Sequence, residues 1–206
     1  MDQKVDTRDR ILHAATERIK HYGYNKTTMA EIAADCRMSP GNIYRFFEAK
    51  IDIAEAMARQ HAMEQNGRLS AIARRKSAPA NQRLRDILTA QMRENYGLVE
   101  RNAKIIELAE VLKRERPLHH SEQLALQRVF LGEVLKDGVE EGLFRPMDIE
   151  FTAEMIQVAV QKFSFPHLFT QLALPKLERE LDGVLTLLLN GLYRPDYGHA
   201  AVANEQ

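Results

Sequence analysis

The sequence predicts an all-α protein: an N-terminal three-helix domain of the helix-turn-helix type and a larger C-terminal helical bundle, about nine helices in total. Apolar residues recur at helical spacing along the chain, and no segment shows the alternation typical of a strand. Two short helical segments near residue 40 are separated only by Arg37, Met38 and Ser39, which is the spacing of a helix-turn-helix unit. With 206 residues, 45% of them hydrophobic and 28% charged, the composition is that of a globular protein.

The first two helices are predicted from their ends. Residues 7–22 follow Asp6, which can cap a helix, and precede Gly23, whose backbone freedom suits a helix C-terminus. A second helix over residues 29–36 follows Thr28, and Glu31 stands at the spacing of a capping box. The buried side of the first helix is expected to carry Ile11, Leu12, Ala15, Ile19 and Tyr22.

A third helix is predicted from Pro40 to about Phe47. Ser39 can cap it, and proline is tolerated at a first helical position because the missing N–H would have no partner there. The inner face locks this helix against the preceding one through Ala33, Met38, Ile43 and Phe47. The outer face is left to Ser39, Gly41, Asn42, Tyr44 and Arg45.

Longer helices follow. They are predicted over residues 49–74, 81–96, 100–114, 122–141, 149–168 and 176–193, with breaks at residues 77–79, Pro117, Gly142, Pro146 and Pro175. We expect a helix-turn-helix domain over residues 1–50, a ligand-sensing and dimerisation domain over residues 51–195, and a loose tail over residues 196–206.

Charge and composition narrow the function classes. Residues 1–76 carry 14 Lys/Arg against 10 Asp/Glu, and the rest carries 15 against 19, so the first part suits a polyanionic partner. The single cysteine, Cys36, excludes an internal disulfide framework. No apolar signal core opens the chain, and the apolar stretch at residues 184–192 is short of the ~20 residues that span a bilayer. We expect a cytoplasmic protein without a membrane partner.

Two motifs carry a resemblance to a known family. Residues 23–33 (GYNKTTMAEIA) and 39–50 (SPGNIYRFFEAK) resemble the opening and recognition-helix signatures of the tetracycline-repressor (TetR) family. Gly142-Leu143-Phe144-Arg145-Pro146 resembles the turn that enters the family's dimerisation helices. The resemblance implies a transcriptional regulator, a repressor released from a palindromic operator in double-stranded DNA by an unknown small-molecule effector.

The same resemblance implies DNA-contacting residues. Thr28 and Tyr44 match phosphate-contacting positions, Lys50 matches a lysine that faces the DNA backbone, and Asn42 and Arg45 can make paired hydrogen bonds to base edges. Arg37 stands where the family often has glycine; if left-handed, it costs ~1 kcal/mol, and it can reach a phosphate. The full predicted set is Thr27, Thr28, Arg37, Ser39, Pro40, Gly41, Asn42, Tyr44, Arg45 and Lys50. The alternatives are a simple cap for Thr28 and solvated surface positions for Tyr44, Asn42 and Arg45.

A homodimer and a ligand pocket are implied for the second domain. The last two helices carry apolar stripes, and the resemblance implies that these helices pair with their copies across a two-fold axis; the alternative is that both stripes are core. The expected interface residues are Ile156, Ala159, Val160, Phe163, Leu181, Val184, Leu185, Leu188 and Leu192. Pocket candidates are Met57, His61, Met92, Tyr96, Ile106, Phe130 and Phe163, and a core histidine is the alternative for His61. The fourth helix is expected to transmit the ligand signal.

Two other function classes are weighed. An enzyme is disfavoured because the sequence has no metal-ligand pair with supporting groups, no glycine-rich phosphate loop and no serine elbow, so we expect no catalytic site, metal or cofactor. A helical protein-interaction module, or an activator without a ligand, would not need the capped unit with Thr28, Tyr44 and Lys50. Salt-dependent binding to duplex DNA separates a regulator from an interaction module.

Overall fold

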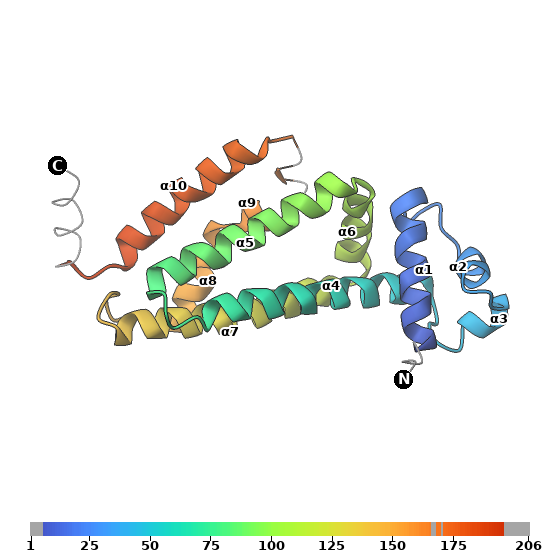
Figure 1. The fold of residues 1–206 in the computed structure, drawn as a ribbon, viewed down its shortest axis with the longest axis horizontal. Coiled ribbons are helices and arrows are strands. Elements are labelled where there is room, and N and C mark those ends of the chain that lie inside the picture. Colours follow the sequence, from blue (N-terminus) through green and yellow to red (C-terminus); the bar gives the residue numbers. More distant parts are fainter. Residues whose placement is uncertain (1–5, 166–167, 170, 196–206) are drawn as a thin grey trace. The chain divides into compact units, whose positions relative to one another are not determined.

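The computed structural model describes residues 6–165, 168–169 and 171–195, and in that part of the chain it forms ten helices and no strand (Figure 1). The all-α prediction is confirmed. The helices are α1 (Thr7–Tyr22), α2 (Met29–Asp35), α3 (Pro40–Ile43), α4 (Lys50–Ala73), α5 (Ala80–Arg101), α6 (Lys104–Glu115), α7 (Pro117–Glu140), α8 (Ile149–Ala159), α9 (Gln161–Ser164) and α10 (Leu174–Leu192). The predicted tail, residues 196–206, lies outside the described residues.

Helix ends that rest on caps match the predictions. The Asp6 side chain accepts a hydrogen bond from the Arg8 N–H at the start of α1, and Thr28 and Glu31 form a complete capping box on α2. The prediction that Tyr22 lies on the buried side of α1 is wrong, because Tyr22 is 50% exposed.

Other predicted boundaries are wrong as well, and α5 continues to Arg101 where the sequence predicted an end at residue 96. The third helix ends at Ile43 instead of Phe47, because Arg45 and Phe46 donate to the carbonyls three residues back and tighten the chain into turns. The helix predicted to start at residue 122 instead starts at Pro117, which marks the break after α6 as predicted, since proline fits a first helical position. The predicted helix over residues 149–168 divides at Val160 into α8 and α9.

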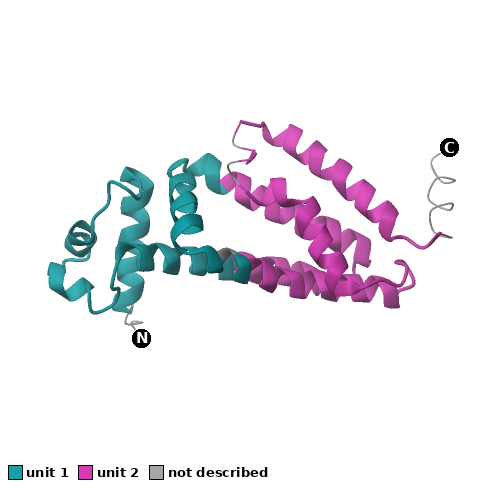
Figure 2. Cartoon of the chain, turned by 180° about the vertical axis from the view of Figure 1, so that it is seen from behind, with its two compact units in different colours: residues 1–64, 98–122 teal, residues 65–97, 123–206 magenta. Residues whose placement is uncertain are grey.

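The described chain forms two compact units, coloured separately in Figure 2. The first consists of Met1–Glu64 with Leu98–Glu122, and the second of Gln65–Gly97 with Gln123–Gln206. The start of α4 and all of α6 therefore group with α1–α3, although we assigned both segments to the ligand-sensing domain by sequence. The functional boundary at residue 50 stays a prediction.

The first unit has two apolar clusters. One joins α1, α2 and the α3 turn through Ile11, Ile32, Ile43, Phe47 and Ile53 among others, which fixes the helix-turn-helix elements on α1. The other joins α1, α4 and α6 and contains Ile19, Tyr24, Ile51, Ala54, Leu108, Val111 and Leu112.

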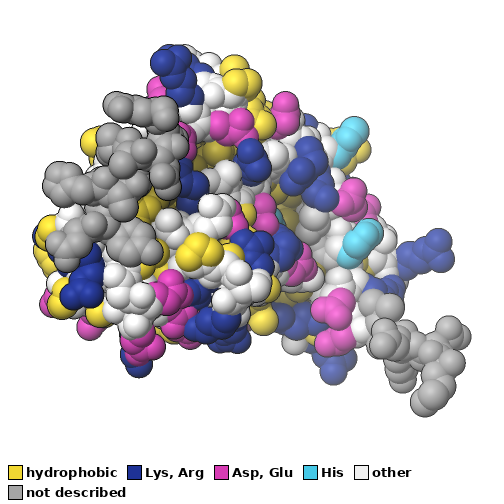
Figure 3. Space-filling model, turned by 60° about the vertical axis from the view of Figure 1, so that its left-hand side comes forward, with side chains coloured by type: hydrophobic (Ala, Val, Ile, Leu, Met, Phe, Trp, Pro, Cys, Tyr) yellow, Lys and Arg dark blue, Asp and Glu magenta, His cyan; other side chains and the backbone are white. Residues whose placement is uncertain are grey.

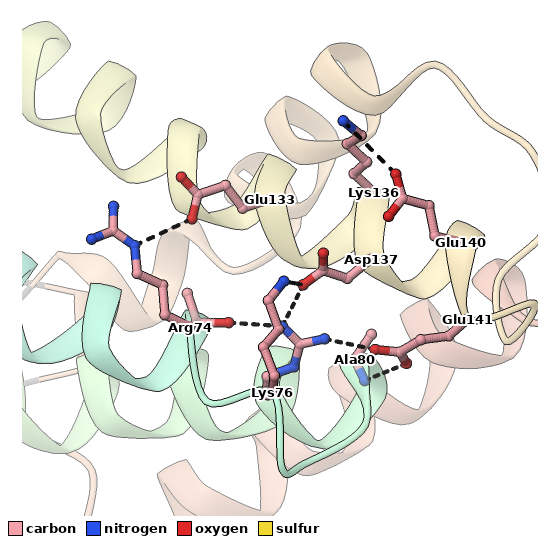
Figure 4. Close-up of polar contacts among 10 residues, drawn as sticks. Arg74, Lys76, Ala80, Glu133, Lys136, Asp137, Glu140 and Glu141 are labelled. Atoms are coloured by element: carbon pink, nitrogen blue, oxygen red, sulfur yellow. Dashed lines mark hydrogen bonds and ion pairs between the residues drawn. The ribbon is translucent and has the colours of Figure 1, made fainter.

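The second unit packs α5, α7, α8, α9 and α10 around one core. Arg83 of α5 is fully buried, and it binds groups of α4 and α7. Two of its partners, Asp137 and Glu141, are labelled in Figure 4. Its guanidinium donates to the Ala73 carbonyl at 2.8 Å, to the Asp137 carboxylate, and to Glu141 Oε1 at 2.8 Å. Burial raises the pKa of the Asp137 carboxyl, but the hydrogen bonds and charges of Lys76 and Arg83 outweigh burial. The pKa therefore lies below its usual value, and the carboxylate is held ionised. These bonds tie the end of α4 to α5 and α7.

The turn at residues 142–146 closes the second unit. Gly142 has φ 73°, and the chain then runs beside the end of α10, where Arg145 N–H donates to the Leu192 carbonyl at 2.9 Å. A Cβ on Gly138 would lie 2.1 Å from the Phe144 ring, so this close approach needs glycine. The turn thus joins the end of α7 to the end of α10.

Charged side chains of both signs alternate over the face shown in Figure 3, with apolar side chains between them. Ion pairs between helices include Arg68 with Glu94 and Arg93 with Glu178, at N···O distances of 2.8 and 2.7 Å. In the described part of the chain, no helix is long and apolar enough to cross a membrane.

Candidate nucleic-acid interface

The N-terminus of α2 is an exposed, capped helix end. Thr28 Oγ1 accepts from the Glu31 N–H at 3.3 Å, and Glu31 Oε2 accepts from the Thr28 N–H at 2.8 Å. Hydrogen bonds from Thr28, first from its hydroxyl and then from its backbone, hold the pKa of the Glu31 carboxyl below its usual value. Thr28 is exposed, at the positive end of a helix, where an anion such as a phosphate is stabilised.

The turn between α2 and α3 is a Schellman motif with arginine in the glycine position. Arg37 has φ 55°, the only non-glycine residue with positive φ in the described chain. Its N–H donates to the Ala34 carbonyl at 2.9 Å, and the Met38 N–H donates to the Ala33 carbonyl at 2.9 Å. The left-handed conformation expected for Arg37 is therefore present, and its side chain is exposed.

The segment after this turn presents its predicted outer face to solvent. Ser39 occupies the cap position of α3 without a side-chain cap bond, so its hydroxyl is not used by the helix. Tyr44 is 54% exposed, Asn42 is half-buried, and a Cβ on Gly41 would meet nothing within 4 Å. Within residues 39–45, the exposed members of the predicted DNA-contacting set are Ser39, Pro40, Gly41, Tyr44 and Arg45.

Side chains of α1 hold α2 and the turns after it in place. Arg18 Nε donates to Asp35 Oδ2 at 2.6 Å, and this hydrogen bond lowers the pKa of the Asp35 carboxyl. Arg10 donates to the Cys36 carbonyl at 2.8 Å, and the Arg8 guanidinium lies 4.7 Å from the centre of the Phe47 ring. These contacts hold α2 and the following turns on α1.

Thr27 does not have the predicted role. Its side chain is 1% exposed, and its hydroxyl donates to the Gly23 carbonyl at 2.8 Å. The hydroxyl is therefore spent inside the loop between α1 and α2, where it cannot contact DNA.

Lys50 lies at the start of α4 as predicted, but its ammonium group binds the chain itself. Nζ donates to the Tyr24 carbonyl at 2.8 Å and the Thr27 carbonyl at 2.7 Å, and lies 4.1 Å from the centre of the Tyr24 ring. Burial lowers the pKa of this ammonium group, while nearby carboxylates such as Glu107 oppose the shift. Lys50 braces the loop that precedes Thr28.

Two features escaped the sequence analysis. Phe46, 38% exposed, follows Tyr44 and Arg45 in the same turns and adds an apolar side chain to the outer face. Glu107 of α6 accepts from the Asn25 N–H at 2.6 Å, and Asn102 donates to the Lys20 carbonyl at 3.0 Å. The position of Phe46 inside the recognition signature, directly after Tyr44 and Arg45, could have indicated it. These contacts of α6 and of Asn102 just before it join residues 82 positions apart and leave no local signal.

The predicted pocket residues fall into both units. Met92, Phe130 and Phe163 are buried in the core of the second unit, where Tyr96 packs against the same core. Met57, His61 and Ile106 belong to the first unit and are half-buried there. The pocket as a whole stays a prediction.

Most predicted dimer residues pack within their own chain. Ile156, Val160, Phe163, Leu181, Leu185 and Leu192 are each at most 7% exposed, Val184 and Leu188 are half-buried, and Ala159 is exposed. The stripes used for that prediction are mainly core stripes. The large apolar side chains that α8 and α10 leave exposed are others: Phe151, Met155, Val158 and Leu187.

Comparison with known proteins identifies the family. The model for bacterial regulatory proteins of the tetR family matches residues 11–57, and that for the tetracyclin repressor-like C-terminal domain matches residues 80–185. The chain belongs to the TetR family. As a TetR-family protein it is a DNA-binding transcription regulator, and the first match contains the whole capped unit from Thr28 to Lys50.

Individual TetR-family relatives are distant. The chain is 27% identical over 158 residues to the uncharacterized HTH-type transcriptional regulator YhgD of Bacillus subtilis (strain 168), covering 72% of this chain and 78% of YhgD. The fold is similar to that of FadR from Bacillus subtilis in complex with stearoyl-CoA (TM-score 0.66, 20% identity, 89% and 98% of the two chains). It is also similar to SmeT, the repressor of the Stenotrophomonas maltophilia efflux pump SmeDEF (TM-score 0.69, 19% identity, 92% of each chain).

Proposed function

We propose that this TetR-family protein is a homodimeric repressor that binds a near-palindromic operator in double-stranded DNA and leaves it when a small-molecule effector binds. The observation that carries the proposal is that residues 39–46 present polar and aromatic side chains to solvent, while Ile43 of the same segment packs into the apolar cluster with α1 and α2. A protein-interaction module would not need a capped helix end beside this segment.

The roles of the side chains follow from their exposure and chemistry. Thr28 and Tyr44 contact phosphates, Asn42 and Arg45 read base edges in the major groove, and Arg37 reaches a further phosphate. Gly41 and Pro40 allow close approach. Lys50 acts indirectly by holding the loop before Thr28, through its two bonds to backbone carbonyls.

Dimerisation is assigned to the exposed faces of α8 and α10. Phe151, Met155 and Val158 form a stripe on α8, and Leu187 lies between Gly183 and Gly191 on α10. A Cβ on either glycine would meet nothing within 4 Å in the single chain. Glycine inside a helix costs roughly 0.5–1 kcal/mol relative to alanine, which a closely packed partner helix would offset. The two-fold axis would set two recognition segments ~34–36 Å apart.

Effector control acts through the elements shared with the DNA-binding helices. FadR, a neighbour in fold, was solved with stearoyl-CoA, so a ligand with a large apolar part is a fitting effector class. Glu107 and Asn102 contact the end of α1 and the loop after it, and Lys50 opens α4. An effector that favours one arrangement of α4 and α6 would shift the population that binds DNA, by no more than its differential affinity. Because this regulator acts on operator DNA, we expect the protein to lie in the cytoplasm.

Selection of bound duplexes from a random DNA pool tests the proposal. We expect an enriched near-palindrome with half-sites about one helical turn apart, and binding that weakens steeply with salt. Enrichment of no sequence, at low ionic strength, would contradict the proposal. Selection of an asymmetric site would keep DNA recognition and remove the two-fold dimer.

A further inference from the structure

Four amide side chains cross the interior of the second unit. This amide row consists of Gln65 on α4, Gln91 and Asn95 on α5, and Gln127 on α7. Gln65, Gln91 and Gln127 are 7%, 9% and 9% exposed, and Asn95 is half-buried. Buried glutamine is uncommon in a helical core, since each amide brings two donors and an acceptor that need partners.

The amides use only part of their hydrogen-bonding capacity. Gln91 Nε2 donates to Gln127 Oε1 at 3.1 Å, and Gln65 Nε2 donates to Asn95 Oδ1 at 3.2 Å. Within residues 6–165, 168–169 and 171–195, these are the only side-chain hydrogen bonds of the three glutamines. Gln91 Oε1, Gln65 Oε1 and Gln127 Nε2 are therefore available to another molecule. None of these three atoms is among the fully buried polar atoms of the described residues that lack a partner, so each keeps some solvent access through which another molecule can reach it.

The surroundings of the row are apolar. Met92, Phe130 and Phe163 belong to the core of the same unit, and Tyr96 stacks on Phe169 with ring centres 6.3 Å apart. Among the described residues of this unit, buried Arg83 is already bound by two carboxylates, and Arg68, one turn from Gln65 on α4, is paired with Glu94. An anion placed at the row would lose its hydration without gaining an opposite charge.

We propose that the amide row recognises the effector, and that the effector is an uncharged molecule with an apolar body and a head group that both donates and accepts hydrogen bonds, such as a carboxamide. The inference rests on the proposed function and names the ligand class of its sensing domain. The glutamines meet the donor and acceptor of such a head group, and the neighbouring core side chains meet its apolar body.

Asn95 connects the row to α9. Its Nδ2 lies 3.4 Å from the Phe163 carbonyl and 3.5 Å from the Ser164 carbonyl, the last two residues of that helix. A ligand that engages Asn95 competes for this amide and changes how the end of α9 is held. Binding at the row thereby affects the segment that follows α8.

Two probes that differ only in head-group charge test the inference: decanamide and decanoate, titrated by calorimetry into the full chain at neutral pH. We expect decanamide to bind and decanoate to bind at least tenfold more weakly. The double variant Gln91→Leu/Gln127→Leu removes both members of a hydrogen-bonded pair, so its fold is retained. We expect it to lose decanamide affinity by about tenfold or more. Gln82→Leu, an exposed amide on the same helix, is the matched control and keeps full affinity.

Circular dichroism and thermal melting establish that the double variant is folded. Equal or tighter binding of decanoate, binding of neither probe, or undiminished decanamide binding by the folded double variant would each overturn the inference. Each of these results leaves the operator selection unaffected, so a chain that binds an operator but fails this test loses the ligand class and keeps the proposed repressor function.

Discussion

At the scale of single residues, the exposed hydroxyl of Tyr44 gives a sequence-independent contact. Tyr44→Phe keeps the ring and removes the donor, so we expect roughly tenfold or greater weakening on every DNA sequence, from the loss of a hydrogen bond to a charged group. Tyr22→Phe is the matched control because Tyr22 is 50% exposed at the far end of α1. Electrophoretic mobility shifts on specific and random duplexes measure both. A loss confined to the operator would contradict the phosphate role.

Asn42 gives the complementary prediction, because an amide can pair with a base edge. Asn42→Ala should cost ~1–3 kcal/mol on the operator and relax preference at one base pair in each half-site. Repeating the random-pool selection with the variant measures this. Wild-type and variant profiles with the same preference at every position would show that Asn42 reads no base.

Arg37 combines a strained, left-handed backbone conformation with a positively charged side chain. Replacing it by glycine removes ~1 kcal/mol of left-handed strain, and the added freedom of the unfolded chain offsets part of that gain. We therefore expect Arg37→Gly to raise stability in urea melts by less than ~1 kcal/mol while operator affinity falls and the salt dependence drops by about one phosphate contact. An unchanged salt dependence would mean that Arg37 makes no phosphate contact.

At the scale of helices, local chemistry decides what a sequence predicts. The ends of α1 and α2 were predictable because Asp6, Thr28 and Glu31 satisfy backbone groups within a few residues of themselves. The short α3 and the break at Val160 were not, since both depend on how Phe47 and Phe163 reach a core formed by distant segments. The burial of Thr27 and the backbone bonds of Lys50 were not predictable for the same reason: their partners lie in the folded loop between α1 and α2.

The capping box on α2 should make the DNA-binding helices acid-sensitive. The pKa of Glu31 lies below its usual 4.5 in the folded chain, so its contribution is present above about pH 4.5 and is lost as the pH falls through the lower folded value. Glu31→Gln should lower the melting temperature at pH 7, and the difference should shrink progressively as the pH is lowered below about 4.5. Melting of both proteins across that range measures the effect. A difference that does not shrink with acid would assign it to something other than the carboxylate.

At the scale of the whole molecule, an apolar stripe alone does not distinguish core from interface. The sequence supplied the apolar periods of α8 and α10, but burial assigns one face of each to the protomer's own core. The exposed face has a different character, with large apolar residues on α8 and glycines flanking Leu187 on α10. Which face meets solvent depends on the helices packed against it, and those come from elsewhere in the chain.

This exposed face yields a matched pair of variants. Val158 of α8 and Val129 of α7 are 59% and 63% exposed, so aspartate costs each little inside the single chain. If the face on α8 and α10 is the two-fold interface, Val158→Asp places a charge in an apolar contact and yields monomers in sedimentation velocity runs, whereas Val129→Asp stays dimeric. Operator affinity should fall with dimerisation, since a monomer occupies one half-site only. A dimeric Val158→Asp variant that binds the operator normally would move the interface to another surface.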